Sequence, residues 1–164
     1  MKRMTSALST AALLLAGAAA YADDDKPKMK DSGAPADLIG AYTIVGGEKY
    51  GQKEDMDRLQ GTTCRIAEDA IIVLDKDKKE AYVQTYKIDV KSKPWKITMK
   101  SKVTPYKDAD AKGEAVAMGL IEKEGDTVKL IYAVPGGDMP TEFKTKEKQL
   151  MFIMKNENKE QKNK

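Results

Sequence analysis

The chain has 164 residues, of which 34% are charged, and its formal net charge at pH 7 is +3. It contains no histidine and a single cysteine, Cys64. These counts exclude Ser-His-Asp and Cys-His nucleophiles, histidine-containing zinc sites and cysteine-based metal clusters. We therefore expect a protein that is not an enzyme and that holds no metal or other cofactor.

The N-terminal segment is typical of a secretory signal peptide. Lys2 and Arg3 give it a positive start, and an apolar run rich in alanine and leucine follows over residues 7–20. That run is shorter than a membrane-spanning helix requires, which disfavours the alternative of an uncleaved anchor. Ala20 and Ala22 fit the small-x-small cleavage rule. We expect a signal peptide over residues 1–22, cleavage after Ala22, and an exported protein that is periplasmic or extracellular.

Export changes the charge balance. Loss of Lys2 and Arg3 leaves 27 basic and 26 acidic residues and a net charge of +1. Proteins that bind nucleic acid carry a basic excess, so we expect no nucleic-acid partner, and we expect a monomer without a membrane span. Cys64 cannot form an internal disulfide; we expect a half-buried, unreactive thiol, with an intermolecular disulfide as the alternative.

Two polar segments flank the predicted folded region. Residues 23–36 are charged and Pro-containing without any apolar period, which predicts a flexible linker. Residues 156–164 contain no apolar residue and predict a disordered tail. One domain over residues 37–155 remains, which is long enough to bury a core.

Within this domain, eight short runs with strand character alternate with turn signals. They are Leu38–Val45, Gly61–Ala67, Ala70–Leu74, Ala81–Val90, Trp95–Lys102, Ala115–Lys123, Thr127–Val134 and Gln149–Lys155. Trp95, Ile97 and Met99 alternate with polar residues, as in a half-buried strand. Glu124-Gly125-Asp126 is the strongest hairpin signal. The segment Lys53–Leu59 is the one helical turn that we expect.

This pattern predicts an all-β protein. No helix is available to connect parallel strands, so the strands must be antiparallel. Both a closed barrel and a sandwich fit these strands. The short connections favour a single antiparallel up-and-down β-barrel of about eight strands, and closure also removes exposed strand edges.

Five stretches of the chain resemble a Planctomycetes-type family of secreted domains of unknown function with lipocalin-like β-barrel character. They are Leu-Ile-Gly-Ala-Tyr-Thr-Ile-Val (38–45), Tyr-Lys-Ile-Asp (86–89) followed by Lys-Pro-Trp-Lys-Ile (93–97), the hairpin over residues 119–130, Pro-Thr-Glu-Phe (140–143) and the apolar strand 150–155. Tyr42 stands where the family has Trp, and Lys155 stands where it has Arg. The resemblance implies a lipocalin-like barrel in which Tyr42 closes one end and Lys155 packs across it by a cation–π contact. It implies no activity and no catalytic residues.

The alternation predicts which side chains face the barrel interior. They are Ile44, Tyr82, Tyr86, Trp95, Ile97, Met99, Met118, Leu120, Leu130, Tyr132, Phe152 and Met154. An eight-stranded barrel either fills itself with such side chains or holds one small ligand. In the second case Tyr82, Tyr86, Trp95, Met99, Met118 and Tyr132 are the candidate ligand-binding residues. The partner is then a small apolar or amphipathic molecule.

The residues also bear on three other functions. A solid barrel would make the protein a structural or interaction module for an envelope protein, with residues 46–59 and 135–140 as contact loops. A carboxylate-based glycosidase would need an inward, perturbed Glu122 or Glu142. A calcium loop beginning at Asp108 lacks the acidic residue that its last ligand position requires. We expect ligand binding by a non-enzyme, with the structural or interaction module built on a solid barrel as the alternative.

Overall fold

The structure is a computed structural model, and it describes residues 32–101 and 115–157. The expected signal peptide, most of the expected linker, the segment that begins at Asp108 and most of the polar tail lie outside these ranges. In the part that is described, no helix is long and apolar enough to cross a membrane.

Short strands dominate the described chain. In chain order the elements are the 3-10 helix η1 (Ala36–Leu38), β1 (Gly40–Lys49), β2 (Gln52–Lys53), the single helical turn α1 (Met56–Leu59), β3 (Thr63–Ile66), β4 (Ala70–Leu74), β5 (Glu80–Asp89), β6 (Trp95–Ser101), β7 (Ala115–Glu124), β8 (Thr127–Ala133) and β9 (Gln149–Asn156). The helical turn expected in residues 53–59 is present as α1, where the Asp55 side chain caps the backbone N–H of Asp57 at 3.0 Å. The strand β2 was not predicted.

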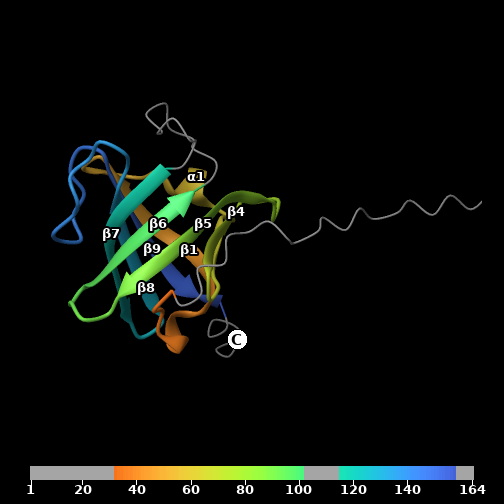
Figure 1. The fold of residues 1–164 in the computed structure, drawn as a ribbon. Coiled ribbons are helices and arrows are strands. Elements are labelled where there is room, and N and C mark those ends of the chain that lie inside the picture. Colours follow the sequence, from red (N-terminus) through yellow and green to blue (C-terminus); the bar gives the residue numbers. More distant parts are fainter. Residues whose placement is uncertain (1–31, 102–114, 158–164) are drawn as a thin grey trace, which may run out of the picture.

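The strands close into an antiparallel barrel. Each of the strands β1 and β3 to β9 pairs with the next one along the chain, and β9 pairs back onto β1 (Figure 1). The small strand β2 pairs antiparallel with the end of β1. The seam between β1 and β9 contains a bulge between Ile44 and Gly46, which bends the strand as closure requires. The prediction of an eight-stranded up-and-down barrel is therefore confirmed.

One end of the barrel is sealed by the chain that precedes β1. Leu38 of η1 is completely buried, and Figure 1 shows η1 (orange) at the end of the barrel opposite to α1. The Ser32 carbonyl oxygen accepts a 2.7 Å hydrogen bond from the Ile88 backbone N–H. Ser32 is 5% exposed, so the last residues of the expected linker are part of the folded body.

The core fills the barrel from this sealed end. Its buried members come from every strand of the barrel: Leu38, Tyr42, Ile44, Cys64, Ile66, Ile71, Tyr86, Ile88, Ile97, Met99, Ile121, Val128, Leu130 and Met154. Where a strand contributes two of these residues, they are alternate residues, such as Ile97 and Met99 of β6, because successive side chains point to opposite faces of a sheet.

A second apolar cluster lies on the outer wall. Leu120, Ile131 and Met151 are buried there beneath Met139 and Phe143, which belong to the connection between β8 and β9. This connection folds back over the strands that it joins. The prediction that Leu120 faces the interior is wrong, because its neighbours Gly119 and Ile121 occupy the inward positions of β7.

Candidate functional site

The barrel is hollow in the half that lies toward α1. A cavity of about 170 Å³ opens there among side chains from six strands, α1 and the residue preceding β3. Its lining consists of Ile44, Leu59, Thr62, Cys64, Ile71, Val73, Tyr82, Gln84, Leu130, Tyr132, Phe152 and Met154. No acidic or basic side chain belongs to this lining. The cavity is therefore suited to an uncharged, mainly apolar occupant.

Two polar side chains on β5 project into the cavity. Tyr82 and Gln84 are two residues apart on one strand, so they share its inward face. Tyr82 is 45% exposed, which places it at the mouth, whereas Gln84 is half-buried. Within the described ranges, neither side chain makes a hydrogen bond to protein. Their donors and acceptors are available to a water molecule or a ligand.

Aromatic rings form part of the opposite wall. Tyr132 and Phe152 lie on the neighbouring strands β8 and β9, with ring centroids 6.3 Å apart and an angle of 30° between the rings. This distance falls within the usual range for aromatic pairs. The two rings give the cavity a rigid apolar side.

Cys64 lines the cavity with its thiol, but this thiol is not a nucleophile at neutral pH. It is 2% exposed, and burial raises the pKa of this thiol to about 12. A thiolate is the reactive form, so Cys64 is inert at neutral pH. The side chain is more deeply buried than the half-buried state we expected. In the described part of the chain, no group of three or more His, Cys, Asp or Glu residues is placed to hold a metal ion.

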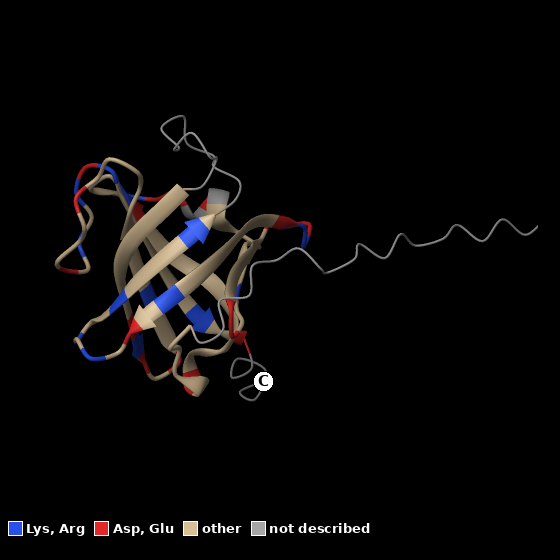
Figure 2. Cartoon of the chain, viewed as in Figure 1, with Lys and Arg blue, Asp and Glu red and all other residues tan. Residues whose placement is uncertain are grey.

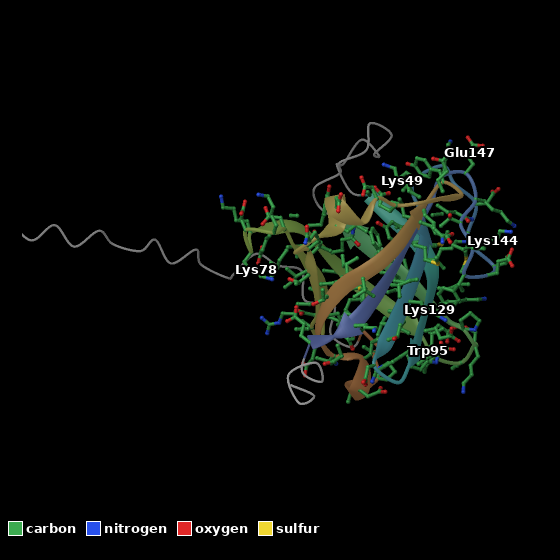
Figure 3. All side chains as sticks on the ribbon, turned by 180° about the vertical axis from the view of Figure 1, so that it is seen from behind. Lys49, Lys78, Trp95, Lys129, Lys144 and Glu147 are labelled. Carbon is green, nitrogen blue, oxygen red and sulfur yellow. The ribbon has the colours of Figure 1, made fainter. Side chains whose placement is uncertain are left out.

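The predicted ligand-binding residues divide into three groups. Tyr82 and Tyr132 line the cavity. Tyr86, Trp95 and Met99 belong to the core but lie outside the cavity lining. The Tyr86 hydroxyl donates a 2.6 Å hydrogen bond to the Ala67 carbonyl oxygen, so this hydroxyl has a structural role. Figure 3 shows Trp95 near the end of the barrel opposite to Lys49.

Met118 is placed differently from the prediction. It is 50% exposed on the outer wall, because its neighbours Ala117 and Gly119 are the β7 residues that take inward positions. It cannot touch a ligand inside the barrel.

The expected closing pair is only half present. Tyr42 is completely buried at the sealed end, but Lys155 is exposed and takes an outward position opposite Thr43 and Thr127. The inward neighbours of Lys155 on β9 are Met154 and Asn156, so Lys155 lies on the wrong face of the strand to pack over Tyr42. Leu38 of η1 covers this end instead.

The acidic residues considered for a glycosidase lie away from the cavity. Glu142 is exposed in the connection between β8 and β9, and Glu122 takes an outward position on β7 opposite Lys129. Neither residue lines the cavity. The two carboxylates therefore do not form an acid–base pair around a shared internal site.

Several cavity residues were missed by sequence reasoning. Gln84 was missed because the inward face of its strand was assigned from apolar and aromatic residues. Thr62 and Leu59 were missed because they come from the segment before β3 and not from a predicted strand. A signal was present for Gln84, since it lies between Tyr82 and Tyr86 at the strand period. The comparisons with family models, curated proteins and solved structures return no match. The family resemblance therefore remains an expectation from the sequence.

Proposed function

We propose that this chain is an exported, lipocalin-like binding module, without enzymatic activity, that holds a small uncharged apolar molecule inside its barrel. The observation that carries the proposal is the cavity beside Tyr82, Gln84 and the Tyr132–Phe152 pair. The remainder of the interior is filled by the core. A barrel that was needed only for its outer surface gains nothing from an internal void, because unfilled volume lowers stability.

The size of the cavity limits the ligand. Sites for drug-sized ligands occupy about 300–1,000 Å³, whereas an engineered apolar cavity of about 150 Å³ binds benzene. A cavity of about 170 Å³ therefore matches a molecule with one ring or two small fused rings. Haem, retinoids and long-chain fatty acids exceed this volume.

The lining also limits the polarity of the ligand. A charged group would lose its hydration without meeting an opposite charge in the wall. Tyr82 and Gln84 offer hydrogen bonds on one side only, near the mouth. The ligand class that fits is a neutral ring system with a single hydroxyl or ring N–H, such as phenol or indole. The polar atom would face Gln84.

Thermal unfolding with small molecules tests the proposal. Phenol, indole and toluene are compared with retinol and palmitate on the full chain as recovered after export. At a concentration 100-fold above Kd, a ligand stabilises the folded state by about 2.7 kcal/mol, which raises Tm by about 8 °C. Calorimetric titration then gives Kd for each compound that raises Tm.

A matched pair of variants locates the site. Val73→Phe places a ring in the cavity, whereas Val83→Phe places the same ring on the outer face of the neighbouring strand, opposite Ile72. We expect Val73→Phe to abolish the ligand shift and Val83→Phe to retain it. A ligand shift that survives Val73→Phe, or the absence of a shift for every ring compound, would overturn the proposal.

The alternative is an interaction module for an envelope protein. Of its two proposed contact loops, residues 135–140 contain Met139, which packs against the outer apolar cluster instead of standing free. The cavity and this packing both favour ligand binding over the interaction module.

A further inference from the structure

A lysine face covers the outer side of the hairpin formed by β5 and β6. It consists of Lys87, Lys91, Lys93, Lys96 and Lys100, all of which are exposed. Lys87, Lys96 and Lys100 alternate with the inward core residues of the two strands, and Lys91 and Lys93 lie in the connecting turn. Figure 2 shows basic residues on the front strands and in the turn between them. The outer side of this hairpin therefore carries a cluster of positive charge.

These lysines form no ion pairs in the described ranges. Across residues 32–101 and 115–157, no ion pair involves any of the five. The one carboxylate within the hairpin, from Lys87 to Lys100, belongs to Asp89, which lies opposite Lys96 in the strand register. It accepts a 3.0 Å hydrogen bond from the backbone N–H of Lys91. Two lysines on the neighbouring strands do form ion pairs, with Lys123 3.1 Å from Asp37 and Lys129 3.0 Å from Glu124. With five ammonium groups and one carboxylate, the hairpin keeps an excess of positive charge on this face.

Exposed apolar side chains stand beside these cations. Val90 is 46% exposed next to Lys91, Val116 is 43% exposed opposite Lys100, and Met118 is 50% exposed opposite Thr98. The five lysines are not accompanied by an arginine or by an exposed aromatic residue, since the Trp95 side chain packs on the core. Single-stranded nucleic acid is bound through stacking on aromatic rings and arginine. This combination of side chains does not provide that stacking.

We propose that the lysine face docks the barrel onto a bilayer that contains anionic lipid. Lys96 and Lys100 lie about 13 Å apart along β6, with Lys87 on the adjacent strand, so several headgroups can be contacted at once. Lysine stems reach apolar surface while their ammonium groups stay at the headgroups. Val90, Val116 and Met118 rest at the boundary between headgroup and acyl chain. Such a position would bring the barrel to the phase where small apolar molecules accumulate.

Vesicle co-sedimentation tests this docking on the full chain as recovered after export. Vesicles of phosphatidylcholine with about one third phosphatidylglycerol are compared with pure phosphatidylcholine, at low and at high salt. We expect binding to the anionic vesicles, and we expect salt to weaken it because the contacts are screened. Binding that is equal for both lipids, or that is unaffected by salt, overturns the proposal.

Two triple variants with the same net charge give the decisive comparison. Lys87→Gln with Lys96→Gln and Lys100→Gln removes charge from the lysine face, while Lys76→Gln with Lys79→Gln and Lys144→Gln removes it from other exposed positions. The first triple variant should lose on the order of 100-fold in vesicle affinity, and the second should change far less. Circular dichroism checks that both are folded.

Equal losses for the two triple variants would show that net charge, not the lysine face, drives binding. A face-dependent affinity for polyglutamate without any affinity for anionic vesicles would assign the face to an acidic protein and overturn the lipid proposal. Neither outcome depends on occupancy of the cavity, so this inference and the proposed ligand-binding function can fail separately.

Discussion

The Tyr42 hydroxyl donates a 2.7 Å hydrogen bond to the carbonyl oxygen of Leu38, four residues earlier in the chain. Both side chains are completely buried. The bond joins η1 to β1. It therefore holds the segment that seals the barrel against the strand that follows it. Tyr86 acts in the same way toward the carbonyl oxygen of Ala67, which lies between β3 and β4. The sealed end is built from phenol hydroxyls that meet backbone carbonyls.

Tyr42→Phe therefore lowers stability while leaving the ring in place. The Leu38 carbonyl oxygen loses its donor in a site that water does not reach, and we expect the free energy of unfolding to fall by about 1–2 kcal/mol. Urea unfolding measures the change. Tyr50→Phe is the control, because Tyr50 is 44% exposed and its loss of a hydroxyl should cost less than about 0.5 kcal/mol. Equal effects of the two substitutions would contradict this account.

Gly119→Ala should be among the most damaging small substitutions. A Cβ at this inward position would collide with the carbonyl oxygen of Ile131 and lie 2.8 Å from the Cα of Tyr132. Backbone atoms cannot yield as a side chain can, so we expect the free energy of unfolding to fall by about 2–3 kcal/mol. Thermal unfolding with a denaturant series gives the value.

A second glycine separates crowding from backbone conformation. Gly125 has a φ of +59° in the turn between β7 and β8, and a Cβ there would meet nothing within 4 Å. Gly125→Ala should cost about 1 kcal/mol, and Gly125→Asn should cost less because asparagine tolerates positive φ. If Gly125→Ala proves worse than Gly119→Ala, the close approach of β7 and β8 is not the controlling factor.

The strands were predictable, but the face of β7 was not. In β6, polar residues separate Trp95, Ile97 and Met99, and the alternation identified the inward face correctly. In β7 both faces carry apolar residues. The outer residue Leu120 can be apolar because the connection between β8 and β9 covers it. The inward face also contains Gly119, which carries no hydrophobic signal. Period-two alternation is absent where both faces of a strand are buried.

The cavity depends on volumes that alternation does not encode. Its wall includes the small or medium side chains Thr62, Cys64 and Val73 on neighbouring segments. Whether such positions leave a void depends on how far the side chains across the barrel extend. The sequence therefore predicts a barrel whose interior could hold a ligand. Of the six predicted ligand-binding residues, only Tyr82 and Tyr132 line the cavity.

Phe143→Ala should loosen the cover on the outer wall. Phe143 packs with Met139 over Leu120, Ile131 and Met151, and its removal exposes that cluster. We expect the free energy of unfolding to fall by about 2 kcal/mol, somewhat less than for a fully enclosed phenylalanine. Hydrogen exchange should show faster exchange in residues 134–148 with little change at the sealed end. The neighbouring Lys144→Ala is exposed and should change neither quantity.

Stability should fall at alkaline pH through groups that burial keeps neutral. Burial raises the pKa of the Cys64 thiol from 9.0 to about 12, and it also raises the pKa of the Tyr42 and Tyr86 hydroxyls above 10.0. Each group ionises more readily in the unfolded chain. The stabilisation is therefore complete below the unfolded pKa and is lost as pH rises toward the folded pKa. The decline should begin near pH 9 for Cys64 and near pH 10 for the tyrosines.

Cys64→Ala isolates the thiol contribution to this decline. The substitution lowers stability at every pH because it enlarges the cavity, but it removes one titrating group. The slope of stability against pH between pH 9 and 10 should become shallower, since one thiol contributes at most about 1.4 kcal/mol per pH unit. Urea unfolding across pH 7–10.5 measures the slope. Ile66→Val is the control, because it removes buried volume without removing a titrating group and should lower the whole curve in parallel. An unchanged slope in Cys64→Ala would mean that the buried thiol does not govern the onset of alkaline unfolding.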